Sequence, residues 1–214
     1  MGMHYKEEFG ATLKKVDLLL GICKPPKRVD VSTAEGLIDR ALVICEASEF
    51  AVLSNKDLDG NVTSRMIEPF KTVLDPCGGP VLSFNTNKLS RKFKQLKKDP
   101  MVTVTYMDKK RLAYVTFVGE ARQIEGPESK RYWIPSLTLF YPEGNDEAKG
   151  SRFTAWEVVP KSLTICDISH GVVSTRQDWN PPELVRDAKE GTWSVVSTGK
   201  EAAAAAAAAV VKSR

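Results

Sequence analysis

The sequence predicts an α+β protein built on an antiparallel β-barrel, closed or split, with about six strands and peripheral helices. Three observations lead to this fold class. First, 42% of the 214 residues are hydrophobic and 27% are charged, a composition that can bury a substantial core. Second, short β-branched segments separated by turn residues follow one another between residues 50 and 167. Third, helical spacing of apolar residues is confined to the start of the chain and to short insertions.

Two helices are expected before the first strand. Residues 5–20 place apolar side chains at helical spacing, and the prolines at positions 25 and 26 end that helix. Ser32 and Glu35 form a capping box, in which the serine hydroxyl and the glutamate carboxylate satisfy free N–H groups of a second helix. This second helix runs to about residue 47. Its apolar face consists of Leu37, Ile38, Ala41, Leu42 and Cys45.

The strands of the barrel are expected in the next part of the chain. Apolar and β-branched runs predict strands over residues 50–54, 62–67, 81–85, 101–107, 112–124 and 153–167. Gly119 marks a possible bulge in the long fifth strand, and Pro160 is expected to interrupt the last one. Two insertions look helical. One precedes Pro100 and turns Leu89, Phe93 and Leu96 inward, and the other covers residues 127–141.

The chain is expected to divide into three parts. Residues 1–30 form an N-terminal helical extension, residues 31–169 the barrel domain, and residues 170–214 a C-terminal extension. In the last part, residues 183–189 predict a short helix and residues 193–196 a strand. The unbroken alanine run 202–209 favours helix but carries no side chain that could recognise a ligand.

Composition argues against several classes of function. The net charge is only +4, and the apolar stretch 16–23 contains Asp17 and is too short to span a membrane. Without a signal-peptide pattern, a cytoplasmic protein with no membrane partner is expected. The four cysteines are scattered and have no nearby histidine, so no metal site is expected. His4 and His170 are the only histidines, and no nucleophile-elbow motif accompanies them, which disfavours acyl transfer.

The segment from Phe84 to Lys92 carries the clearest chemical signal. A strand is expected to end and a helix to begin here, so free N–H groups and the positive end of the helix dipole would gather with hydroxyls and cations. This is the chemistry of a phosphate site. The same residues could also form a solvated basic helix face. A nucleic-acid footprint is a further reading, but no exposed aromatics are interleaved with the cations, so nucleic acid is not favoured as a partner.

Four motifs occur in an order that is known from one protein family. They are Asp57-Leu58-Asp59-Gly60, then Ser64-Arg65-Met66, then Thr86, Ser90 and Lys92 at four- and two-residue spacing, and finally Trp133-Ile134-Pro135 followed by Phe140-Tyr141-Pro142-Glu143-Gly144. Residues 35–167 thereby resemble the pyridoxamine 5′-phosphate oxidase-like superfamily of FMN-binding split barrels, and in particular its general-stress-protein branch. The resemblance implies a six-stranded antiparallel split barrel with peripheral helices.

The resemblance also implies a cofactor and a set of site residues. It predicts a homodimer with FMN in a cleft between the subunits. The strand that carries Ser64, Arg65, Met66 and Ile67 would lie along the isoalloxazine ring. The ribityl chain and phosphate would be held by Asn85, Thr86, Ser90, Arg91 and Lys92. Trp133 would cover the flavin or its substrate, unless it is a partly buried helix anchor.

Departures from the family pattern limit what the resemblance implies. The oxidase proper has a lysine where this chain has Phe70 and a glutamine where it has Tyr114. The arginine expected after the pair Tyr132-Trp133 and a C-terminal Arg-x-His are absent from the sequence. True pyridoxamine phosphate oxidase activity is therefore not expected, and no catalytic residue can be named.

Several functions remain open from the sequence. The first is an FMN-dependent oxidoreductase that uses a small-molecule electron donor or acceptor. The second is a flavin-binding stress or sensor protein without turnover. The third is a haem-binding split barrel, for which His170 is the candidate axial ligand. The fourth is a basic nucleic-acid module.

Overall fold

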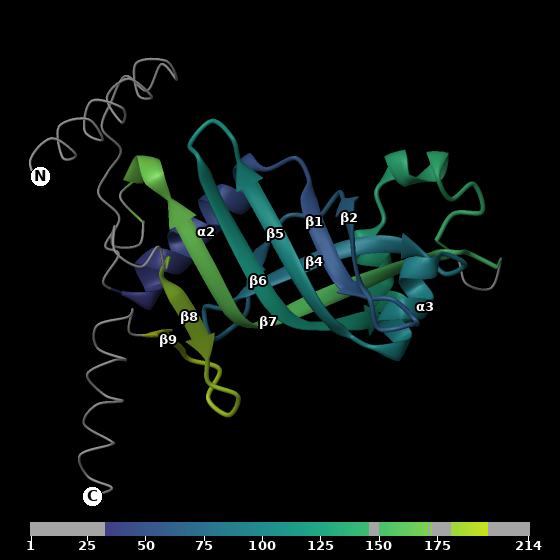
Figure 1. The fold of residues 1–214 in the computed structure, drawn as a ribbon. Coiled ribbons are helices and arrows are strands. Elements are labelled where there is room, and N and C mark those ends of the chain that lie inside the picture. Colours follow the sequence, from purple (N-terminus) through teal and green to yellow (C-terminus); the bar gives the residue numbers. More distant parts are fainter. Residues whose placement is uncertain (1–32, 146–149, 171, 173–180, 197–214) are drawn as a thin grey trace, which may run out of the picture.

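The computed structural model describes residues 33–145, 150–170, 172 and 181–196 (Figure 1). The helix predicted over residues 5–20 and the alanine run 202–209 lie outside these residues. Within the described part, two α-helices, α2 (Ala34–Ala47) and α3 (Arg91–Lys98), accompany one antiparallel sheet. No helix in these ranges is long and apolar enough to cross a membrane.

Within the described residues the sheet has nine strands. It runs in the order β2-β1-β5-β6-β7-β4-β3, with β8 paired to β7 and β9 paired to β8. The strands are β1 (Ala51–Lys56), β2 (Val62–Ile67), β3 (Val73–Leu74), β4 (Pro80–Asn87), β5 (Met101–Asp108), β6 (Ala113–Ile124), β7 (Phe153–Asp167), β8 (Glu183–Arg186) and β9 (Trp193–Val196). The six predicted strands correspond to β1, β2, β4, β5, β6 and β7.

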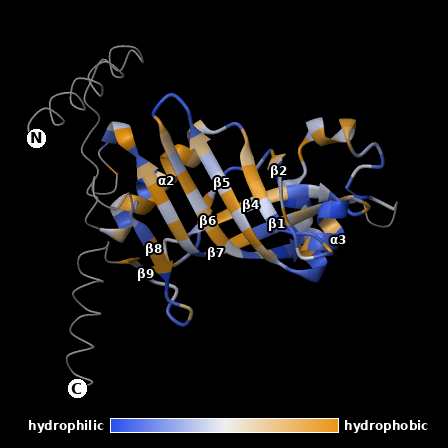
Figure 2. Cartoon of the chain, in the orientation of Figure 1, coloured by the Kyte–Doolittle hydropathy of each residue, from blue (hydrophilic) through white to orange (hydrophobic). Residues whose placement is uncertain are grey.

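The sheet curls so that its two ends approach each other. A bridge between Pro69 and Phe84 and a 2.8 Å hydrogen bond from the Phe70 N–H to the Ser83 carbonyl join the segment after β2 to β4. Hydrophobic and hydrophilic residues alternate along the strands (Figure 2), and buried and more exposed residues alternate with them in β5 and β6. The fold is therefore the predicted α+β split barrel.

The core lies inside this barrel. Leu53, Val115, Phe117 and Leu163 are fully buried, and Tyr106 packs edge-to-face on Phe117 with ring centroids 6.0 Å apart. Helix α2 packs against β5 and β6 at one end of the barrel, and α3 packs near β1 and β4 at the other end (Figure 1). The two helices thus close opposite ends of one hydrophobic core.

Helix α2 buries its predicted apolar face, with Leu42 only partly covered. Its N-cap is Thr33, whose hydroxyl accepts a hydrogen bond from the Gly36 N–H at 3.1 Å. This is one residue later than the predicted Ser32, which lies outside the described residues. Both residues are good N-caps, so the choice depends on where the buried face begins.

The predicted bulge at Gly119 is confirmed, but the predicted break at Pro160 is wrong. The register between β6 and β7 shifts between Val118 and Gly119. A Cβ on Gly119 would lie 2.4 Å from the Val159 carbonyl oxygen, which explains the glycine. Strand β7 continues through Pro160, because a proline that cannot donate a ladder hydrogen bond is tolerated at a bulge.

Two other segments differ from the prediction. Residues 183–186 form β8 rather than a helix, because Glu183, Leu184 and Val185 pair with β7 and Leu184 is fully buried there. The local pattern was compatible with either element, and the tertiary pairing decided it. The predicted strand over residues 193–196 is confirmed as β9. The predicted helical region 127–141 consists of two 3₁₀ helices, η1 (Gly126–Tyr132) and η2 (Pro135–Leu139).

Candidate functional site

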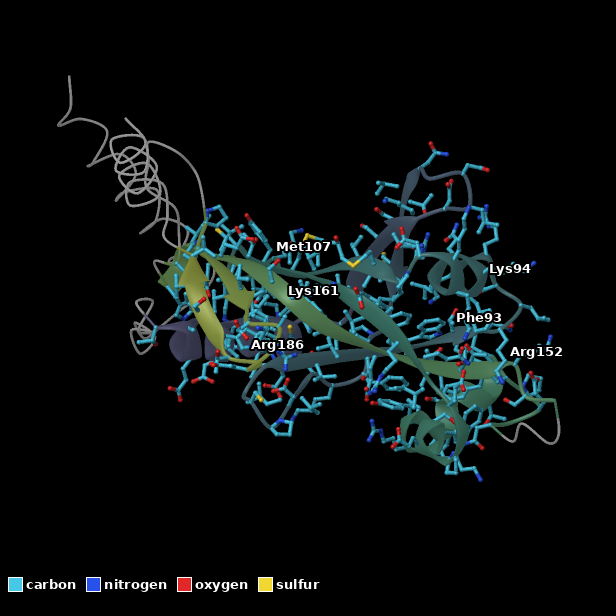
Figure 3. All side chains as sticks on the ribbon, turned by 90° about the horizontal axis from the view of Figure 1, so that it is seen from below. Phe93, Lys94, Met107, Arg152, Lys161 and Arg186 are labelled. Atoms are coloured by element: carbon cyan, nitrogen blue, oxygen red, sulfur yellow. The ribbon has the colours of Figure 1, made fainter. Side chains whose placement is uncertain are left out.

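A groove of about 750 Å³ lies between β2 and the start of α3. We call it the β2–α3 groove. Its lining comes from residues 57–59 of the β1–β2 turn, residues 63–65 of β2, and Ser90, Arg91, Lys92, Lys94 and Gln95. In Figure 3, Lys94 points outward from α3, whereas Phe93 points beneath the helix, where it contacts Trp156 with ring centroids 5.9 Å apart.

The start of α3 is built by the turn that follows β4. Ser90 is the N-cap of the helix, and its hydroxyl accepts a hydrogen bond from the Phe93 N–H at 3.1 Å. The Thr86 hydroxyl lies 3.0 Å from the Ser90 hydroxyl and fixes the turn against β4. Leu89, predicted to face inward, is 69% exposed, because it belongs to the turn before the helix. The segment therefore presents a helix N-terminus to the groove.

Arg65 reaches from β2 toward α3. Its guanidinium donates hydrogen bonds to Asn55 Oδ1, to Thr63 Oγ1 and, over 3.1 Å, to Gln95 Oε1. Burial lowers the pKa of Arg65, and the charge of Arg91 lowers it further. The like-charge effect shows that two cations share this site.

Lys92 is a third cation of the site. Its ammonium group donates to the Asn85 carbonyl at 3.2 Å and lies 5.2 Å from the centroid of the Phe84 ring. Burial, followed by the charge of Arg65, lowers the pKa of Lys92 to about 8. An anion bound beside it would restore the usual preference for the protonated form.

The positive charges of the groove have no carboxylate partners. Within the described ranges, Arg65, Arg91 and Lys92 form no ion pair. The carboxylate of Asp57, which also lines the groove, accepts hydrogen bonds from the Asp59 and Asn61 N–H groups of its own turn, each at 2.9 Å. A helix N-terminus, hydroxyls and unpaired cations together fit a phosphate group.

The remaining predicted site residues lie elsewhere. The side chain of Asn85 points to the other face of β4, where its Oδ1 accepts from the Tyr141 hydroxyl at 3.0 Å. Trp133 lies on that face too, in edge-to-face contact with Phe153 at 5.3 Å between ring centroids. Ile67 and Thr86 are buried. Of the ten predicted residues, Ser64, Arg65, Ser90, Arg91 and Lys92 line the β2–α3 groove.

Met66 belongs to a second groove, of about 900 Å³, on the outer face of the sheet. We call it the apolar groove. It also contains Tyr114. Other apolar members are Phe50, Val52, Met107 and Leu112. Because β2 side chains alternate, Arg65 and Met66 put the two grooves on opposite faces of one strand.

Sequence reasoning missed Asn55, Thr63 and Gln95, the three side chains that accept hydrogen bonds from Arg65. Gln95 and Asn55 are both buried and both hold Arg65. Gln95 follows Arg91 by four positions, so helical spacing alone could have placed it on the same face. Nothing in the local sequence marks Asn55, because its contact with Arg65 depends on the pairing of β1 with β2.

Comparisons with known proteins agree with this fold. No curated protein sequence matches the chain significantly. A solved structure of a protein related to general stress protein 26, from Clostridium acetobutylicum, is 17% identical, with a TM-score of 0.52 over 63% of this chain and 91% of that chain. A pyridoxamine 5′-phosphate oxidase-related, FMN binding protein from Nostoc punctiforme is 15% identical, with a TM-score of 0.52 over 77% and 96%.

A third structure is PhzG from Burkholderia lata, in complex with tetrahydrophenazine-1-carboxylic acid. It is 16% identical, with a TM-score of 0.55 over 80% of this chain and 95% of that chain. At such identities the structures show the fold alone. The family model described as pyridoxamine 5′-phosphate oxidase, however, matches residues 39–165, which is more than half of the sequence. The chain therefore belongs to the pyridoxamine 5′-phosphate oxidase-like family of FMN-binding split barrels.

Proposed function

We propose that this protein binds FMN in the β2–α3 groove and acts as an FMN-dependent oxidoreductase. The observation that carries the proposal is the group of cations without carboxylate partners at the start of α3. The family commonly binds FMN, and some of its members bind haem. A flavin phosphate supplies the dianion that such a group of cations favours.

The side chains at the start of α3 have distinct roles in this proposal. Arg91, Lys92 and the first N–H groups of α3 hold the phosphate, while Ser90 keeps the helix start in place. The backbone of strand β2 between Ser64 and Ile67 lies along the ring, whereas the side chain of Arg65 reaches toward α3. FMN, when bound, supplies the hydride and electron transfer, and the protein contributes binding, orientation and polarity.

We further propose a homodimer in which the apolar groove is covered by a second copy of the chain. Met66 is 67% exposed and Met107 58% exposed on this face, which is continuous with the proposed flavin site through β2. Light scattering should then report a dimer. Replacing both methionines by glutamate should give a monomer, whereas a monomeric wild-type protein would contradict the dimer.

The substrate is proposed to differ from pyridoxamine phosphate. Phe70 and Tyr114 stand at positions where the oxidase proper uses a lysine and a glutamine. In this structure Phe70 packs on Tyr132, with ring centroids 5.3 Å apart, and lines no part of the β2–α3 groove. A small-molecule electron donor or acceptor other than pyridoxamine phosphate fits these residues better. A flavin-binding protein without turnover is the alternative.

The haem alternative has less support from the described residues. His170 has a side chain that is 7% exposed, and its Nδ1 lies 3.0 Å from Asp167 and 2.9 Å from Ser169. These contacts give His170 a structural role at the end of β7. A Soret band that disappears in the His170→Ala variant would nevertheless establish haem binding.

The experiment that tests the proposed cofactor is the visible spectrum of the purified protein before and after titration with FMN. We expect a flavin band that is retained through gel filtration and quenching of flavin fluorescence on binding. A protein that leaves FMN fluorescence unchanged would contradict the proposal. Oxidation of a reduced nicotinamide by the FMN-loaded protein would then separate the oxidoreductase from the flavin-binding protein without turnover.

A further inference from the structure

Three neutral side chains hold Arg65. Asn55, Thr63 and Gln95 each accept a hydrogen bond from its guanidinium, and we call them the neutral clamp. Asn55 and Gln95 are 4% and 8% exposed, so the clamp belongs to the interior of the protein rather than to its surface. Arg65 is thereby oriented without losing its net charge.

Most other arginines in the described ranges have a carboxylate partner. Eight arginines lie in the described ranges, and all except Arg65 and Arg91 form an ion pair with a carboxylate. The paired ones are Arg40, Arg111, Arg122, Arg131, Arg152 and Arg186. The two exceptions both line the β2–α3 groove.

Stability alone would favour a carboxylate in the clamp. A glutamate is isosteric with Gln95 and would add the attraction of opposite charges to the hydrogen bond that Arg65 already donates. It would also relieve the repulsion that Arg91 and Lys92 exert on Arg65. A neutral amide instead keeps the positive potential of the groove available to a ligand.

We propose that Gln95 and Asn55 are positioning residues that direct the uncompensated charge of Arg65 at the phosphate of the ligand, so that the groove selects phosphorylated over unphosphorylated flavin. This inference rests on the proposed FMN site. It differs from what the family resemblance implies, which places Arg65 against the isoalloxazine ring. The proximity of Arg65 to Arg91 and Lys92 supports the phosphate end.

The test compares the affinities of FMN and riboflavin, which differ only in the phosphate, in three proteins: wild type, Gln95→Glu and Gln95→Met. We expect Gln95→Glu to weaken FMN roughly tenfold to a hundredfold and riboflavin less than twofold. Gln95→Met removes one acceptor without adding a charge and should weaken FMN only a few-fold. If Gln95 served only to hold Arg65, the order would be reversed, because glutamate is the stronger acceptor.

A matched control separates local from global charge. Lys97→Gln changes the net charge by the same amount on the same helix but lies outside the groove lining, so FMN affinity should stay within about twofold. Thermal unfolding without ligand should show no loss of stability in Gln95→Glu. Asn55→Asp alters another member of the neutral clamp and should also weaken FMN binding more than riboflavin binding. If Gln95→Glu fails to fold, the Asn55→Asp variant tests the inference in its place.

The outcomes are distinguishable from failure of the proposed function. Wild-type protein that binds neither flavin contradicts the FMN site itself, and the neutral clamp then loses its proposed purpose. A second outcome overturns only the further inference. In it the wild-type protein binds FMN, and the Gln95→Glu variant either keeps this affinity or loses affinity for FMN and riboflavin equally. Equal losses would place Arg65 at the ring.

Discussion

The arginines at the two ends of the barrel have opposite kinds of partner. At the α2 end, Arg40 is paired with Asp167, and both side chains are almost fully buried. At the α3 end, Arg65 is held only by neutral groups beside two further cations. Removing one partner of a buried ion pair leaves an uncompensated charge and destabilises the fold, whereas a group of cations without carboxylate partners attracts an anionic ligand. The contrast separates a structural site from a candidate binding site within one sheet.

The Arg40–Asp167 pair joins two elements that are far apart in the chain. Burial alone would raise the pKa of Asp167, but hydrogen bonds from His170 and Ser169 and the charge of Arg40 lower it overall. The carboxylate therefore stays ionised at neutral pH. It fixes α2 to the end of β7 across 127 residues of sequence.

The largest effect is expected from breaking the ion pair between Arg40 and Asp167 at the α2 end of the barrel. Asp167→Ala leaves the buried Arg40 charge uncompensated and should lower the free energy of unfolding by about 3–5 kcal/mol. Denaturant unfolding measures this loss. Glu120→Ala is the control, because it removes an exposed partner of Lys161 and should change stability by about 1 kcal/mol or less. Similar losses in both variants would mean that burial of the pair does not matter.

The next largest effect is expected from removing the cations at the α3 end of the barrel. Arg91→Ala combined with Lys92→Ala should weaken FMN binding roughly a hundredfold, since two charge-assisted contacts of at least about 1.5 kcal/mol each are removed. Fluorescence titration measures the affinity. The control pair Lys97→Ala and Lys98→Ala makes the same charge change on the same helix outside the groove lining. Unchanged FMN affinity in the first variant would remove the phosphate site from α3.

The pH dependence of binding should give a smaller effect. The pKa of Lys92 is about 8 without ligand, and a bound phosphate would raise it, so binding takes up a proton above pH 8. FMN affinity should therefore fall by up to about tenfold between pH 8 and 9, relative to riboflavin. Lys92→Arg keeps its charge and should abolish this dependence. A flat profile in the wild-type protein would speak against Lys92 as a phosphate ligand.

The lowered pKa of Lys92 also affects the stability of the protein without ligand. The pKa of Lys92 is lower in the folded protein than its ordinary value of 10.5, so the buried charge destabilises the fold below pH 8. This destabilisation should be relieved as the pH rises from about 8 toward 10.5. Comparison of wild-type and Lys92→Met unfolding across this range separates the contribution of Lys92 from that of other groups.

The smallest effect is expected at a second paired site. Glu157 accepts hydrogen bonds from Arg122 at 2.8 Å and from Arg131, but these arginine side chains are 69% and 57% exposed. Solvent therefore screens the pairs, and Glu157→Gln should lower the free energy of unfolding by only about 1 kcal/mol. FMN affinity should not change. If Glu157→Gln lowered the free energy of unfolding as much as Asp167→Ala does, solvent exposure of the arginines would not explain the difference in strength between the two sites.

Prediction from sequence succeeded where the signal is local. The strand 62–67, the bulge at Gly119 and the end of α3 before Pro100 follow from alternation, steric limits and proline chemistry. The junction that brings Ser90, Arg91 and Lys92 together was also predicted, and its affinity for phosphate stays a prediction. Where local preference was ambiguous, as in residues 183–186, pairing with β7 decided the outcome.

The sequence by itself therefore determined which segments form the six long strands of the barrel, and it placed a strand-to-helix junction before α3. Only the tertiary structure decided which side chains meet. Gln95 reaches Arg65 across 30 residues, and Asn85 turns its side chain away from the groove toward Tyr141. The physical reason is that strand register and helix packing set the direction of every side chain, and both depend on contacts between segments that are distant in the chain.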